Sequence, residues 1–126
     1  GNYETFGDES NDVYYAAGQL EFTDVPAEGS YITIKDDTTG ETYKFVFTSN
    51  PGGVTDPGSY AVDISTGIVS ASDFAQKFAE QIQDVMPGAK RFTASGNSIQ
   101  IVQSLTGGAL SIDCSKTLAC VQSAVG

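Results

Sequence analysis

The most strongly patterned stretch of the chain, residues 71–85, has apolar side chains at helical spacing. The apolar members are Ala71, Phe74, Ala75, Phe78, Ile82 and Val85. Polar residues occupy the other side of this stretch. Ser70 is a candidate N-cap with Asp73 three residues later, and Pro87-Gly88 ends the pattern. These features predict one amphipathic helix whose apolar side faces a core.

Period-two alternation of apolar and polar residues predicts strands on both sides of this helix. Strands are expected at 19–23, 31–35, 42–48, 91–95 and 98–103, with shorter ones at 61–65 and around Leu110 and Ile112. A turn ending at Gly40, which suits a positive φ, and the pair Gly96-Asn97 each join two strands into a hairpin. Residues 115–126 fit either a short helix or a strand.

Strands before and after a single helix indicate the α+β fold class. We expect an antiparallel β-sheet built from two hairpins with one amphipathic helix packed on it. The length of 126 residues suits one domain. The sequence divides into an N-terminal arm, 1–16, and a single α+β domain, 17–126.

The arm combines acidic residues with four aromatic residues and has no basic residue. The aromatic residues are Tyr3, Phe6, Tyr14 and Tyr15. Such rings favour burial, so the arm either anchors on a neighbouring subunit or folds back on its own domain. Residues 49–60, rich in Pro and Gly, predict a long loop that is either an interaction element or a solvated excursion. Val54 and Tyr60 are its candidate partner contacts.

The charge balance excludes several classes of partner. Sixteen acidic residues face six basic ones, which gives a formal charge of −10. Nucleic acids and anionic membranes would repel such a chain. No window is long and apolar enough to predict a transmembrane helix, and no basic region followed by an apolar core predicts a secretion signal.

Two cysteines, Cys114 and Cys120, lie six positions apart. In a helix they would be too distant to bridge, so a disulfide requires a loop or hairpin between them. Two buried thiols are the alternative, favoured by the lack of a visible secretion signal.

Catalytic and metal-binding patterns are missing from the sequence. The chain has no His, no nucleophile elbow and no phosphate-binding loop. Carboxylates Asp36, Asp37 and Glu41 surround a hairpin turn, where solvation rather than catalysis is expected. We therefore expect no enzymatic activity, no metal and no cofactor.

The order of motifs resembles a module found in structural proteins of tailed bacteriophages. It begins with GQLEFTDVPAEGSYITIK at 18–35, a strand, a Pro-Ala-acidic-Gly turn and a second strand. The aromatic strand TYKFVFT at 42–48, the capped helix and the hairpin ASGNSIQI at 94–101 follow, and then the turn TGGA at 106–109. The arm and the cysteine-bearing tail depart from this module.

The resemblance implies a non-enzymatic component of a phage virion that is assembled in the cytoplasm of the host bacterium. The first hypothesis is a capsid decoration or cement protein on the head surface, bridging the major capsid protein and contacting copies of itself, as in a trimer. The alternatives are a tail tube, fibre or baseplate component and, less favoured without Trp, a secreted carbohydrate-binding module.

Overall fold

The computed structural model of the chain describes residues 2–6, 17–36, 40–86, 92–102, 110–118 and 120–125. For residues 2–6, 17, 36, 102 and 120–125 it describes the backbone alone. Its elements are β1 (Asn2–Phe6), β2 (Ala17–Phe22), β3 (Tyr31–Asp36), β4 (Thr42–Thr48), the 3-10 turn η1 (Pro51–Gly53), β5 (Ser59–Asp63), α1 (Ala71–Val85), β6 (Phe92–Ser95), β7 (Ser98–Val102), β8 (Leu110–Cys114) and β9 (Cys120–Val125).

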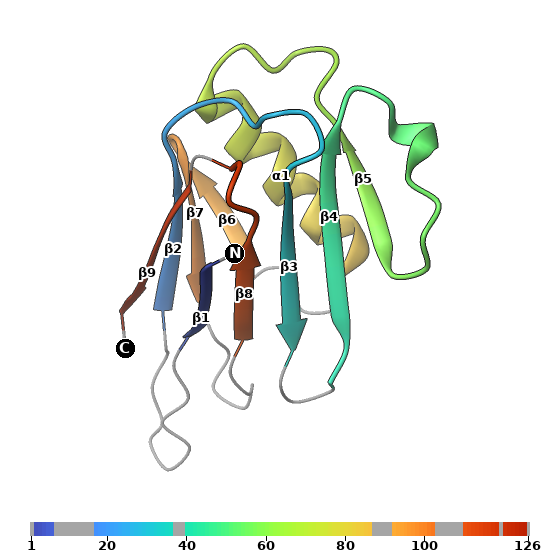
Figure 1. Cartoon of the computed structure of the whole chain (residues 1–126). Helices are drawn as coiled ribbons and strands as arrows, with labels where there is room; N and C mark the ends of the chain where they lie inside the picture. The colour runs from blue at the N-terminus through green and yellow to red at the C-terminus, as the bar shows by residue number, and fades with distance from the viewer. Residues whose placement is uncertain are drawn as a thin grey trace.

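The described strands form two sheets that enclose a common core with the helix (Figure 1). One sheet has the order β1-β8-β3-β4-β5 and the other β6-β7-β2-β9. All neighbouring strands are antiparallel except β4 and β5, which are parallel. The α+β class, with one helix packed on strands, is confirmed, and the two predicted hairpins fall in different sheets.

Helix α1 packs against the inner sides of both sheets. It contacts β6, β7 and β2 of the four-stranded sheet and β5 of the five-stranded sheet. Its rings join the two: Phe74 lies 4.8 Å from Phe22 of β2 and 4.7 Å from Phe47 of β4, measured between ring centroids. Phe78 lies 4.9 Å from Phe47 and 5.3 Å from Phe45. The predicted apolar side of the helix is therefore the centre of the core.

The alternation along each strand decides which side chains fill this core. Ile32 and Ile34 of β3 and Phe45 and Phe47 of β4 are fully buried, as the period-two pattern predicted. The other sheet contributes buried side chains in the same alternating way, from Leu20 and Phe22 of β2 and from Ile99 and Ile101 of β7. Removal of this apolar surface from water is the main stabilising contribution.

Both hairpins are confirmed, and each depends on a glycine with positive φ. Gly40 has φ +77° before β4, and Gly96 has φ +59° between β6 and β7. No described residue other than glycine has positive φ, so Asn97 takes negative φ. A positive φ at the first central residue only, which favours glycine there, is the geometry of a type II′ turn. This turn type matches the twist of the two strands that it joins.

The parallel pair differs from the hairpins. The sequence placed a strand at 61–65 after a loop reaching residue 60, whereas β5 begins at Ser59 and ends at Asp63. Residues 49–58 carry the chain from the end of β4 back to the start of β5 and run beside the outer edge of β5 (Figure 1). Their turn η1 contacts β5.

The ends of the described chain also join the sheets. Residues 2–6 form β1, paired with β8 with Tyr3 opposite Asp113, so this part of the arm folds back on its own domain. Residues 7–16, with Tyr14 and Tyr15, lie outside the described residues. Of the two alternatives for the tail, a strand is observed, because β9 pairs with β2.

Candidate functional site

Two described connections, loops 23–30 and 64–70, cross the end of the molecule that is uppermost in Figure 1. Loop 23–30 joins β2 to β3 there, and loop 64–70 leads from β5 into α1. We call residues 23–30 and 64–70, together with the first turn of α1, the upper surface. Side-chain hydrogen bonds fix the backbone of this surface at four points.

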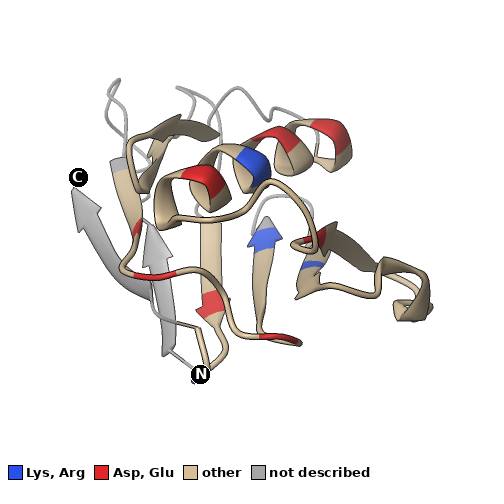
Figure 2. Cartoon of the chain, turned by 90° about the horizontal axis from the view of Figure 1, so that it is seen from above, with Lys and Arg blue, Asp and Glu red and all other residues tan. Residues whose placement is uncertain are grey.

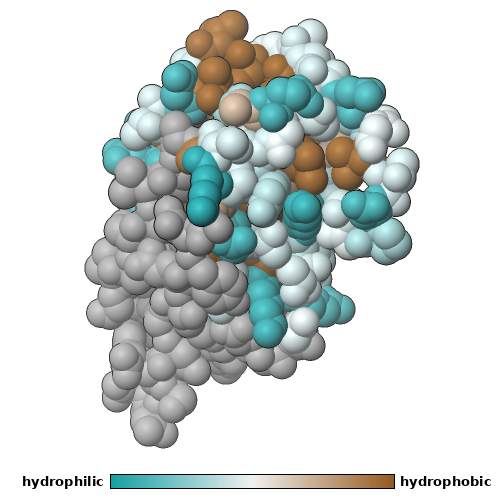
Figure 3. All heavy atoms as spheres, viewed as in Figure 1, coloured by the Kyte–Doolittle hydropathy of each residue, from teal (hydrophilic) through white to brown (hydrophobic). Residues whose placement is uncertain are grey.

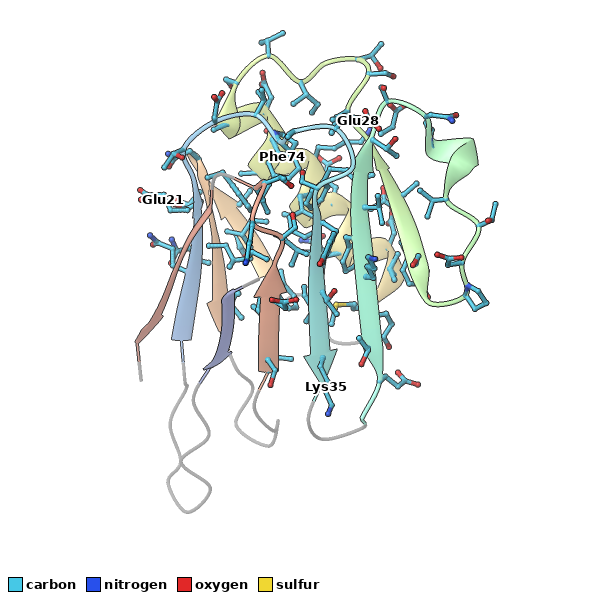
Figure 4. The ribbon with its side chains drawn as sticks, in the orientation of Figure 1. Glu21, Glu28, Lys35 and Phe74 are labelled. Carbon is cyan, nitrogen blue, oxygen red and sulfur yellow. The ribbon has the colours of Figure 1, made fainter. Side chains whose placement is uncertain are left out.

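Glu28 fixes the first loop to the end of β4. Its carboxylate accepts hydrogen bonds from the Thr48 hydroxyl, from the Ser49 N–H at 2.8 Å and from the Ser49 hydroxyl at 2.8 Å. The backbone adds two bonds, from the Gly29 N–H to the Phe47 carbonyl and from the Phe47 N–H to the Ser30 carbonyl, each 2.8 Å. Figure 4 shows Glu28 at this end of the molecule.

Asn97 fixes the β6–β7 turn to the end of β2. Its side-chain amide donates to the Phe22 carbonyl at 3.0 Å, and its own carbonyl accepts from the Phe22 N–H at 2.9 Å. The Ser72 hydroxyl of α1 donates to the Gly96 carbonyl at 3.2 Å. The turn therefore joins the helix to the four-stranded sheet.

The start of α1 has a reciprocal cap. The Ser70 hydroxyl accepts from the Asp73 N–H at 3.1 Å, as the sequence predicted, and an Asp73 carboxylate oxygen accepts from the Val69 N–H at 3.2 Å. Just before this cap, Asp63 accepts from the Ser65 N–H at 2.8 Å and from the Ser65 hydroxyl at 2.6 Å. Loop 64–70 is thus held at both ends.

Two of these carboxylates have shifted acidities. Hydrogen bonds from Thr48 and Ser49 lower the pKa of Glu28, and hydrogen bonds from Ser65 lower the pKa of Asp63. Glu28 is exposed and Asp63 is half-buried, and both are held in the ionised form as acceptors. These carboxylates hold the loops in place. A carboxylate that acts as a general acid or base near neutral pH requires a raised pKa, whereas these two pKa values are lowered.

Exposed apolar side chains occur at this same end. Among the described residues, the large hydrophobic side chains that are exposed are Val69, at 88% of its surface, and Val25, at 38%. Val25 lies in the loop 23–30 and Val69 directly before the helix cap. Figure 3 shows hydrophobic atoms gathered at the upper end of the molecule.

Acidic residues lie at this end and along the helix that begins there. Asp24 and Glu28 lie in the first loop, and Asp73, Glu80 and Asp84 lie on α1, whose one basic residue is Lys77. Figure 2 looks down on this end and shows red acidic residues along the loop and the helix. A shallow hollow beside the helix is lined by Ile68, Asp73, Lys77 and Glu80, among others.

The sequence-predicted contacts occupy different places. Val54 is half-buried directly after η1, and Tyr60 is half-buried in β5, with its ring centroid 5.8 Å from that of Phe45 and 6.2 Å from that of Tyr43. Tyr60 therefore packs against the core. The side chains of Tyr3 and Phe6 lie outside the described ones, as do Tyr14 and Tyr15. Whether these aromatic residues contact a partner stays a prediction.

The two cysteines lie in strands of different sheets. Cys114 ends β8 with a buried side chain, and Cys120 begins β9, where the backbone alone is described. The choice between a disulfide and two buried thiols stays a prediction, because the Cys120 side chain lies outside the described ones. Sequence reasoning did not identify Val25 or Val69, because an apolar residue just before a capping serine is expected to pack against the helix and not to be exposed.

Within the part of the chain that the structure describes, no cluster of three or more His, Cys, Asp or Glu side chains could hold a metal ion. No described helix is long and apolar enough to span a membrane. Comparison of the chain with protein-family models, with curated proteins and with solved structures found no match.

Proposed function

We propose that the protein is a non-enzymatic structural component of a tailed-phage virion, and specifically a decoration or cement protein of the head. The observation that carries this proposal is the upper surface, where hydrogen-bonded loops present an exposed valine at 88% of its surface. A fixed backbone that displays apolar side chains to solvent suits binding to another protein.

The order of elements adds support from the sequence resemblance. Strands β2, β3 and β4, the capped helix α1 and the hairpin β6–β7 occur in the order of the phage module. Six buried phenylalanines, Phe22, Phe45, Phe47, Phe74, Phe78 and Phe92, give the described domain a dense core. A small rigid domain can bind weakly at each site and still hold firmly to a lattice that repeats the site.

Particle composition tests this function. Virions of the phage that encodes the chain would be purified, separated into heads and tails, and analysed by quantitative mass spectrometry against the major capsid protein. We expect the chain on heads, in a simple ratio to the major capsid protein. Its presence on tails alone would replace the head assignment with a tail assignment, and its absence from all particles would remove the virion role.

A further inference from the structure

We propose that the upper surface, centred on Val69, is the face with which the protein docks, and that its partner is a protein surface with an apolar recess surrounded by Lys and Arg. This inference rests on the proposed function in taking the head lattice as that partner. Three features of the upper surface support it: the exposure of Val69, the hydrogen bonds that hold its backbone and the charge around it.

The exposure of Val69 is unusual for its position. An apolar residue just before a helix N-cap commonly packs against the fourth helical residue, which here is Phe74. Phe74 is instead fully buried beneath other rings, and Val69 is 88% exposed. The methyl groups of Val69 therefore contribute little to this fold, and burial in a complex would remove them from water.

The backbone that carries Val69 is held in place before any partner binds. The Val69 N–H donates to Asp73, the Ser70 hydroxyl accepts from the Asp73 N–H, and the adjoining Ser72 hydroxyl donates to the turn at Gly96. A partner would therefore order little additional structure on binding. A small ordering cost leaves more of the contact energy as affinity.

The charge around Val69 specifies the chemistry of the partner. Asp24, Glu28, Asp73 and Glu80 belong to the upper surface or to the helix beside it. The basic residues near them are Lys77 of α1 and Lys116, which follows Ser115, the residue that hydrogen-bonds to Tyr31 after loop 23–30. A second copy of the chain docking with this face would bring like charges together, whereas a basic protein surface would be attracted. The whole chain, with formal charge −10, adds to that attraction.

Heads from a phage that lacks the gene for this chain provide the probe. Binding of purified wild-type protein to these heads would be compared with binding of Val69→Ser and of the control Thr93→Ser, which removes a methyl group from an exposed residue of β6, outside the upper surface. We expect about tenfold weaker binding for Val69→Ser and wild-type binding for Thr93→Ser. Thermal unfolding of each variant is measured first, and V69S should melt with the wild type because Val69 is exposed.

The outcomes separate this inference from the proposed function. If wild-type protein binds heads and V69S binds equally well, or if T93S loses as much affinity as V69S, the docking surface is elsewhere and the head function stands. If wild-type protein does not bind the heads, the head function itself fails. Wild-type affinity should also fall steeply as NaCl is raised from low to moderate concentration, and binding that is insensitive to salt would overturn the basic partner.

Discussion

At the scale of single residues, polar side chains of this protein hold connections in place. Glu28 accepts three hydrogen bonds from Thr48 and Ser49, and Asn97 exchanges two with the backbone of Phe22. Ser115 does the same at the end of β8: its N–H donates to the Tyr31 carbonyl, and its hydroxyl accepts from the Tyr31 N–H at 3.0 Å. Each of these residues joins segments far apart in the sequence.

Glu28→Gln should lower the free energy of unfolding at neutral pH, because the amide loses the charge-assisted acceptors for Ser49. The folded-state pKa of Glu28 is lowered from its usual 4.5, so its contribution is present above about that pH and is lost as pH falls through the folded value. The difference between wild type and variant should therefore be largest at neutral pH and disappear in acid. Urea unfolding of both proteins at pH 7 and pH 3 measures this.

The control for this prediction is Glu80→Gln, which neutralises an exposed carboxylate on α1. It should leave the free energy of unfolding nearly unchanged at both pH values. A Glu28→Gln protein that matched the wild type at neutral pH would show that the hydrogen bonds to Ser49 do not hold the loop.

At the scale of elements, local signals in the sequence predicted the helix and the hairpins well. Ser70 and Asp73 marked the start of α1, and Gly96-Asn97 set the register of β6 against β7. Pairings between distant segments could not be predicted in this way. The pattern of β2 says that Leu20 and Phe22 face a core, but not that β7 and β9 flank it.

The parallel strand β5 shows the same limit. Parallel pairs commonly need a long crossover, usually with a helix, whereas residues 49–58 return the chain with only the short turn η1. The Pro and Gly residues of this segment correctly predicted irregular structure. They contain no signal for the direction of the strand that follows, and Tyr60 was therefore assigned to the loop instead of the sheet.

A glycine substitution tests the β6–β7 turn as an element. Gly96→Ala places a side chain at φ +59° and should destabilise the protein by about 1–3 kcal/mol. Gly52→Ala is the matched control: Gly52 has no positive φ, and an added Cβ would meet nothing within 4 Å. It should be neutral or slightly stabilising. Thermal unfolding of the two variants compares them, and equal destabilisation would contradict the assigned turn type.

At the scale of the whole molecule, one aromatic cluster joins the helix to both sheets. Phe78 of α1 lies 6.2 Å from Phe22 of the four-stranded sheet and 5.3 Å from Phe45 of the five-stranded sheet, between ring centroids. Figure 4 shows Phe74, its neighbour in the cluster, in the interior of the molecule, with Glu21 and Lys35 at the outside. The two sheets and the helix should therefore unfold together.

Phe78→Ala should destabilise the protein by about 3–5 kcal/mol, because it removes a fully buried ring and leaves a cavity. The loss is large against the stability of an ordinary domain. Far-UV circular dichroism and tyrosine fluorescence, followed during the same denaturant titration, should give coincident transitions in wild type and variant. Gln76→Ala, on the exposed side of the helix, should change stability by less than about 0.5 kcal/mol.

The candidate site was the part least accessible from the sequence. The arm and the Pro- and Gly-rich loop were predicted as partner contacts from their composition. The upper surface is recognised only from the exposure of Val25 and Val69 in the folded structure. Val69 and Phe74 are both apolar and only five positions apart, yet one is exposed and the other buried. That difference is set by how the helix meets two sheets, which no local pattern encodes.

A three-dimensional reconstruction of the virion by cryo-electron microscopy tests the central claim most directly. If the protein acts as a rigid binding surface on the head, density for its two sheets and helix will lie on the outside of the capsid, with the end bearing Val69 in contact with the major capsid protein. Density for this fold within the tail would contradict the account. So would the absence of such density from virions in which mass spectrometry detects the chain.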